Sequence, residues 1–155
     1  MKLIIYAGLS KTGTTALQLY MKKNQAILDK LGIACVSTDD NNFNCSVLAA
    51  SIRRGEFKQL EFALQEACCA SSSGQVLMSG EGFEEAFSSA KFVENVQLTA
   101  LSVGFEEVLW VFVVREPIAH LDSLYRELSK YGSTERMRTI LERIIKDGYY
   151  QHCFY

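Results

Sequence analysis

A short segment near the N-terminus combines glycine, lysine and hydroxyl side chains at a spacing suited to holding an anion. It reads G-L-S-K-T-G-T-T over residues 8–15, between an apolar run at residues 2–7 and a helical pattern at residues 14–31. Backbone N–H groups converge where such a loop opens a helix, and the helix dipole adds about half a positive charge. Lys11 adds a full charge, and the threonines add hydroxyl donors. The segment therefore predicts a phosphate-binding cradle.

This loop differs from the loop of nucleoside-triphosphate enzymes, which requires G-x-x-x-x-G-K-[ST]. Gly8 and Gly13 have that spacing, but Thr14 stands where the lysine belongs, and the lysine is at position 11. No apolar run ends in the aspartate that a Mg²⁺-dependent enzyme of that class uses. A nucleotide kinase is therefore the second choice among enzymes. A capped turn without a ligand is the structural alternative, and it is disfavoured because a lysine inside such a turn calls for an anion.

A second group of polar residues follows the apolar run at residues 107–114. Arg115 stands at the end of that run, and Ser123 comes eight residues later, about two turns into the next helix, on a polar side shared with His120 and Glu127. Ligands of open α/β sheets bind at such strand ends. An arginine fork with a serine hydroxyl makes a phosphate clamp, with charge-assisted bonds of roughly 1.5–3 kcal/mol each. A structural ion pair of Arg115 is the alternative for the arginine taken alone.

The two motifs together resemble the sulfotransferase family, whose members use 3′-phosphoadenosine 5′-phosphosulfate (PAPS). K-T-G-T-T at residues 11–15 and R-x-P-x(5)-S at residues 115–123 lie about 100 residues apart, as in that family, and the opening G-L-S-K-T-G-T-T-A-L-Q most resembles bacterial members. The resemblance implies that the first motif holds the 5′-phosphosulfate and the second holds the 3′-phosphate. The residues so implied are Lys11, Thr12, Gly13, Thr14 and Thr15 in the first motif, and Arg115 and Ser123 in the second.

Sulfuryl transfer to a hydroxyl or amine needs a group that takes the acceptor proton. In relatives that act on carbohydrates this is often a glutamate just past a middle strand, and Glu81 holds that place after the apolar run at residues 76–79. The alternative is an acidic residue that merely favours a helix start. His120 and His152 are weaker candidates. The resemblance implies Lys11 and Glu81 as catalytic residues, no metal, and a small-molecule or carbohydrate acceptor.

The elements that must position these residues alternate between strand and helix patterns. Strands are expected at residues 2–7, 33–37, 76–79 and 107–114. Helices are expected at residues 14–31, at 47–70 with an interruption near Gly55, at 82–102, at 117–130, and in a last segment whose apolar stripe runs from Met137 to Ile145. This alternation predicts a three-layer α/β fold with a mainly parallel sheet.

The length and composition of the chain are compatible with a single nucleotide-binding domain over residues 1–155. Hydrophobic residues make up 48% of the chain, which suffices for a packed core, and the net charge of −2 gives no basic field for nucleic acid. No apolar run approaches the length of a membrane helix. The five cysteines are odd in number and form no C-x-x-C, which disfavours metal or disulfide frameworks and favours reduced thiols in a cytoplasmic protein.

The end of the chain departs from the family pattern. Family members continue past the second phosphate motif with further strands and helices, so we expect this chain to be the N-terminal part of a longer domain. The aromatic tail at residues 149–155 should pack either on the core or on a partner, which would allow a homo-oligomer. A non-catalytic nucleotide-binding or interaction module that lacks its C-terminal half is the alternative from outside the enzymes.

Overall fold

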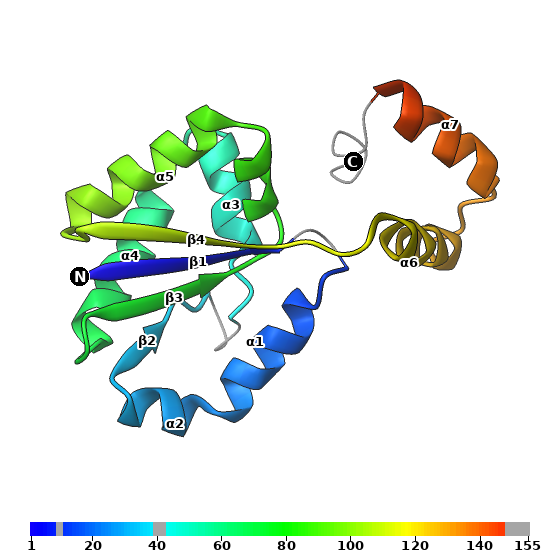
Figure 1. The fold of residues 1–155 in the computed structure, drawn as a ribbon. Helices are drawn as coiled ribbons and strands as arrows, with labels where there is room; N and C mark the ends of the chain where they lie inside the picture. The colour runs from blue at the N-terminus through cyan, green and yellow to red at the C-terminus, as the bar shows by residue number, and fades with distance from the viewer. Residues whose placement is uncertain (9–10, 39–42, 148–155) are drawn as a thin grey trace.

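Four parallel strands form one sheet, in a computed structural model that describes residues 1–8, 11–38 and 43–147. The strands are β1 (Lys2–Gly8), β2 (Ile33–Cys35), β3 (Gln75–Ser79) and β4 (Glu107–Val113). Their order across the sheet is β2-β3-β1-β4, so β1 lies between β3 and β4 (Figure 1). All four predicted strands are confirmed, although β2 is shorter than expected.

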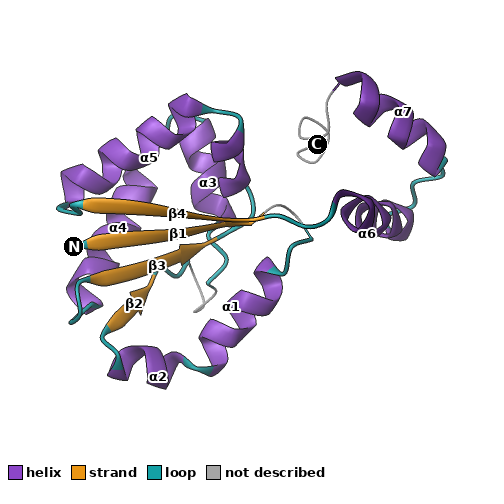
Figure 2. Cartoon of the chain, viewed as in Figure 1, coloured by secondary structure: helices purple, strands orange, loops and turns teal. Residues whose placement is uncertain are grey.

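Helices cover the two faces of the sheet, which confirms the predicted three-layer α/β fold (Figure 2). The connection from β1 to β2 runs in the opposite direction across the sheet from the later connections, and right-handed crossovers therefore place its helices on the opposite face. The helices are α1 (Thr14–Lys23), α2 (Gln25–Lys30), α3 (Ser46–Arg53), α4 (Lys58–Ala70), the 3₁₀ helix η2 (Phe83–Phe87), α5 (Ala90–Val103), α6 (Pro117–Lys130) and α7 (Met137–Asp147). None of these helices is both long enough and apolar enough to cross a membrane.

The main core lies between the sheet and the layer formed by α3, α4 and α5. Leu3, Ile5 and Ala7 of β1 are fully buried there, whereas Ile4 and Tyr6 on the other side of the strand are only half-buried. The two faces of β1 are therefore buried unequally. The helices α1 and α2 leave part of their face of the sheet open, and Leu109 of β4 is exposed there.

The predicted helix over residues 14–31 is two helices. Asn24 separates α1 from α2, and its side-chain amide donates to the carbonyl of Tyr20 at 2.8 Å. An asparagine that bonds a nearby carbonyl competes with the helical ladder, which explains the break. Of the expected apolar stripe, Met21 is buried, while Tyr20 and Leu31 are more than half exposed.

Other helix boundaries follow local signals. The predicted break near Gly55 is confirmed by its positive φ of 76° between α3 and α4. The predicted helix at residues 82–102 divides into η2 and α5, because Ser89 caps α5 by accepting the backbone N–H of Phe92 at 3.1 Å. Pro117 opens α6 as expected, and the preceding Glu116 caps it by accepting two backbone N–H groups. These bonds lower the pKa of Glu116.

The helices α6 and α7 pack on each other in a second, smaller apolar cluster beyond the ends of the strands (Figure 1). Its buried members are Leu121, Ile140 and Ile144. His120, expected on a polar side of α6, is fully buried instead, whereas Ile118 near the start of the helix is exposed. Residues 39–42 and the aromatic tail with His152 lie outside the described residues.

Candidate functional site

Residues 11–13 of the loop after β1 lie close to the end of that strand. Lys11 has a φ of 64°, and Gly13, directly before α1, has a φ of 94°. A Cβ added to Gly8 would stand 2.5 Å from the hydroxyl oxygen of Thr12. Glycine at positions 8 and 13 is therefore required by close approach and by left-handed backbone respectively. Leu9 and Ser10, in the same predicted cradle, lie outside the described residues.

The N-terminus of α1 opens toward this loop. Its cap residue is Gly13, which has no side chain with which to accept the first N–H groups, and no acidic side chain lies in the first turn. The first turn of a helix has no internal acceptors, so these groups favour an anion. Thr14 is buried beside Gly8, while Thr15 is exposed and Thr12 half-exposed. Of the three threonines, Thr14 is therefore the least accessible to a ligand.

The structure brings the two sequence motifs together. Arg115, which follows β4, donates from Nη1 to the backbone carbonyl of Lys11 at 3.3 Å. Ser123 of α6 lines a pocket of about 410 Å³ that Lys11 also lines. Arg115 does not belong to the lining of this pocket; it contacts the loop backbone with its side chain exposed. Lys11 and Ser123 thus share one pocket, while Arg115 supports the loop.

Three further charged residues of α6 line the same pocket, and the sequence analysis did not select them as ligands. Arg126, Glu127 and Lys130 do so together with the aromatic ring of Tyr131. Glu127 forms an ion pair with Lys11, and both side chains are about 30% exposed. Arg126 pairs with Asp122 at 3.0 Å near the surface. The pocket therefore carries three cations and one carboxylate, and that carboxylate already contacts the loop lysine.

The loop after β3 supplies the predicted base and a second carboxyl. Glu81 is exposed, and its backbone N–H donates to Oγ of Ser46 at 3.1 Å. Glu84 is buried and accepts the backbone N–H of Gly82. Burial raises the pKa of Glu84, and nearby Arg53 opposes that rise. Glu81 is thus accessible to a ligand from solvent, while the carboxyl of Glu84 is buried and holds the backbone of its own loop.

The ends of β3 and β1 form the topological switch point of the sheet, where the connections after two neighbouring strands run in opposite directions. The chain leaves β1 toward α1 on one face and leaves the neighbouring β3 toward α5 on the other, and ligands of α/β sheets bind at such a point. Ser79, the last residue of β3, is fully buried, and its hydroxyl has no hydrogen-bond partner among the described residues. Gly80 follows in contact with backbone, since an added Cβ would stand 2.6 Å from the carbonyl carbon of Cys45. The Glu81 loop is therefore packed tightly against the backbone at the start of α3, and Glu81 is not among the residues that line the pocket of Lys11.

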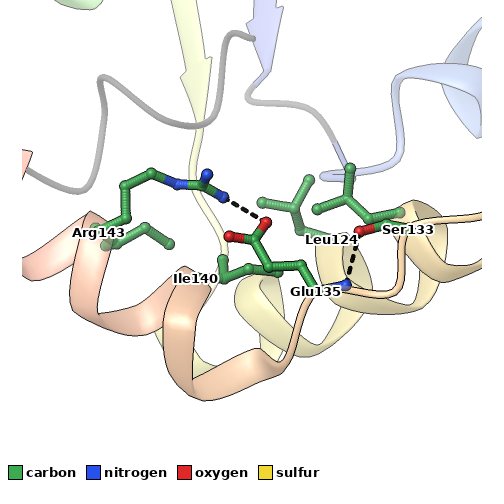
Figure 3. Close-up of a pocket in the computed structure, with 7 residues that line it drawn as sticks. Leu124, Ser133, Glu135, Ile140 and Arg143 are labelled. Atoms are coloured by element: carbon green, nitrogen blue, oxygen red, sulfur yellow. Dashed lines mark hydrogen bonds and ion pairs between the residues drawn. The ribbon is translucent and has the colours of Figure 1, made fainter.

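A second, smaller pocket of about 200 Å³ lies between α6 and α7 (Figure 3). Its lining mixes leucine and isoleucine side chains, such as Leu124 and Ile140, with polar and charged ones. Arg143 and Glu135 form an ion pair at 3.0 Å beside it. None of the residues selected from the sequence lines this pocket. The pocket that contains Lys11 is the better candidate site, because Lys11 and Ser123 both line it.

Comparison of the chain with protein-family models, with curated proteins and with solved structures finds no match.

The residue that sequence reasoning placed beside Ser123 without a role is Glu127. Lys11 and Glu127 are 116 positions apart, so no local sequence pattern predicts their contact. The signal available in the sequence was that Ser123 and Glu127 share one side of α6, because Glu127 lies one turn after Ser123. Glu84 gave no comparable signal, since three glutamates occur within residues 81–85.

Proposed function

We propose that this chain binds the phosphate groups of an adenine nucleotide and that the nucleotide is PAPS, which makes the chain a sulfotransferase domain. The observation that carries the proposal is the meeting of two motifs distant in sequence. Lys11 and Ser123 line one pocket, and Arg115 donates to the backbone of Lys11. The resemblance of both motifs to the sulfotransferase pattern supports the nucleotide's identity.

The residues present fit such a ligand at its 5′ end. Gly13 leaves open space beside the backbone, since no atom lies within 4 Å of a Cβ built there, and the uncapped N-terminus of α1 supplies donors. The lysine charge stands in the same turn. When bound, PAPS supplies an activated sulfuryl group attached to a good leaving phosphate.

Lys11 and Glu81 take the two active roles in this proposal. The bond from sulfur to the bridging phosphate oxygen breaks, a bond from sulfur to the acceptor oxygen or nitrogen forms, and the acceptor proton passes to the Glu81 carboxylate. The Lys11 ammonium faces the negative charge that develops on the leaving phosphate, and its attraction is strongest in the transition state. Both residues follow neighbouring parallel strands, β1 and β3, and therefore lie beyond the carboxyl ends of the strands.

The exposed position of Glu81 is compatible with an acceptor that approaches from solvent. An accessible carboxylate at the end of β3 can receive a proton from a hydroxyl or amine of a molecule that approaches from solvent. A small molecule or a carbohydrate supplies such a group. We therefore propose an acceptor of this class.

Ser123→Ala tests the second phosphate contact. The chain should bind 3′-phosphoadenosine 5′-phosphate more tightly than adenosine 5′-phosphate, and the variant should lose about tenfold of that preference, as expected for one charge-assisted bond. The measurement is calorimetric affinity for both nucleotides. Ser129→Ala is the matched control, because Ser129 lies on α6 outside the pocket and bonds the carbonyl of Tyr125. Equal loss of affinity for both nucleotides in Ser123→Ala would show that this serine does not read the 3′-phosphate.

A further inference from the structure

The pocket beside the loop contains a carboxylate where an anionic ligand is expected. Glu127 of α6 forms an ion pair with the ammonium of Lys11, and the two side chains are each about 30% exposed. A second contact joins the same elements, because Arg115 before α6 donates to the Lys11 carbonyl. The loop lysine is therefore engaged from the α6 side through its side chain and through its backbone.

The mobility that a displaceable contact needs is consistent with how α6 is packed. The apolar cluster of α6 is shared with α7, and it is separate from the main core under the sheet. None of the residues in the main core cluster comes from α6 or α7. A shift of this helical pair would therefore leave the sheet and its main core intact.

We propose that Glu127 is an internal competitor for the anion site: its carboxylate holds Lys11 in the ligand-free chain, and an anionic ligand must displace it to bind. The inference rests on the phosphate site of the proposed function. A carboxylate beside the ligand position opposes anion binding twice, because it pairs with the required cation and because it repels the incoming charge.

The other charges of the pocket indicate which ligands overcome this opposition. Arg126 and Lys130 line the same pocket on α6, so a ligand with two linked anionic groups can contact Lys11 and a further cation together. A ligand with one anionic group gains only one such contact while it displaces the same carboxylate. The arrangement therefore favours a diphosphate or a phosphosulfate over a single sulfate or phosphate.

The contact also links the ligand to the helical pair. Glu127 is released from Lys11 when an anion binds, and the side-chain tie between the loop and α6 is then lost. In the ligand-free chain, Glu127→Gln breaks the same tie without adding a ligand and should therefore increase amide hydrogen exchange in α6.

The test uses inorganic pyrophosphate and inorganic sulfate as probes and compares three forms of the chain by titration calorimetry. Glu127→Gln keeps the shape of the side chain and should bind pyrophosphate about tenfold more tightly than the unaltered chain, with a similar gain for sulfate. Glu142→Gln is the control, because it makes the same change of charge in an exposed pair with Arg138 on α7. It should leave both affinities unchanged.

Two outcomes would overturn the inference, and they differ in what else they overturn. If the unaltered chain binds pyrophosphate and Glu127→Gln binds it no more tightly than Glu142→Gln, Glu127 does not compete and the phosphate site itself stands. If no form binds pyrophosphate, both the competitor role and the proposed phosphate site fail.

Discussion

Replacing Lys11 by alanine should lower the rate of sulfuryl transfer by about 10²–10³-fold, the loss expected when one charge-stabilising donor is removed. Donor affinity should fall by a smaller factor, since the ammonium contributes most when negative charge has built up on the leaving oxygen. The glycines and the N-terminus of α1 remain in the variant and continue to hold the anion. The measurement is release of 3′-phosphoadenosine 5′-phosphate from PAPS, with water or an added hydroxyl compound as acceptor, beside donor affinity.

Two further lysine variants test whether the loss in Lys11→Ala depends on the shape and the position of the charge. Lys11→Arg should restore the rate only in part, because a planar guanidinium cannot replace a point charge in a turn with positive φ. Lys2→Ala removes the same charge at the other end of β1, where Lys2 pairs with Glu107 at 3.1 Å, and it should not change the rate. A normal rate in Lys11→Ala would leave this residue with a binding role alone.

Replacing Glu81 by glutamine should lower the transfer rate by about 10²–10⁴-fold, the range expected for loss of a general base. Donor affinity should not change, because Glu81 is exposed on the loop after β3 and its described bond is through its backbone N–H to Ser46. Glutamine keeps that backbone bond and the size of the side chain. Turnover and donor affinity measured on one preparation separate the two effects.

Glu84→Gln is the control for that variant, three residues further along. Burial raises the pKa of Glu84, so the folded chain binds this proton more tightly than the unfolded chain does. The carboxyl therefore contributes more to stability at low pH, and that contribution is lost as the pH rises through the folded-state pKa. The Glu84→Gln variant, whose side chain is neutral, should unfold no more easily than the parent near neutral pH. It should also keep the transfer rate. A rate loss in Glu84→Gln that equals the loss in Glu81→Gln would assign the base to the buried carboxyl.

The sheet could be predicted because its strands are short apolar runs that end at glycine or at polar residues. Residues 2–7 and 107–114 gave β1 and β4 almost to the residue, since four of the eight residues in the latter run are valine. Parallel pairing followed from the alternation of strands and helices. Helix ends were less predictable. The break at Asn24 depends on one side-chain bond to Tyr20, and an asparagine is also compatible with a helix interior.

The candidate site divides in the same way. The anion loop is local in sequence, so its glycines and Lys11 could be selected from the sequence alone. Its neighbours are set by tertiary packing, and the expected clamp of Arg115 with Ser123 shows the difference: Ser123 reaches the pocket, while the Arg115 side chain reaches the Lys11 carbonyl. The burial of His120 also depends on packing, because the helical pattern alone placed it on a polar side of α6.

The central claim is that the loop at residues 8–15 holds the 5′ end of a nucleotide that also carries a 3′-phosphate. The most direct test is a calorimetric titration of the chain with 3′-phosphoadenosine 5′-phosphate and, separately, with ATP and Mg²⁺ at the same ionic strength. Because Thr14 replaces the lysine of the triphosphate loop, and because Ser123 faces the pocket of Lys11, the bisphosphate should bind more tightly without metal. Equal or tighter binding of Mg²⁺-ATP would contradict the account and favour a nucleotide kinase.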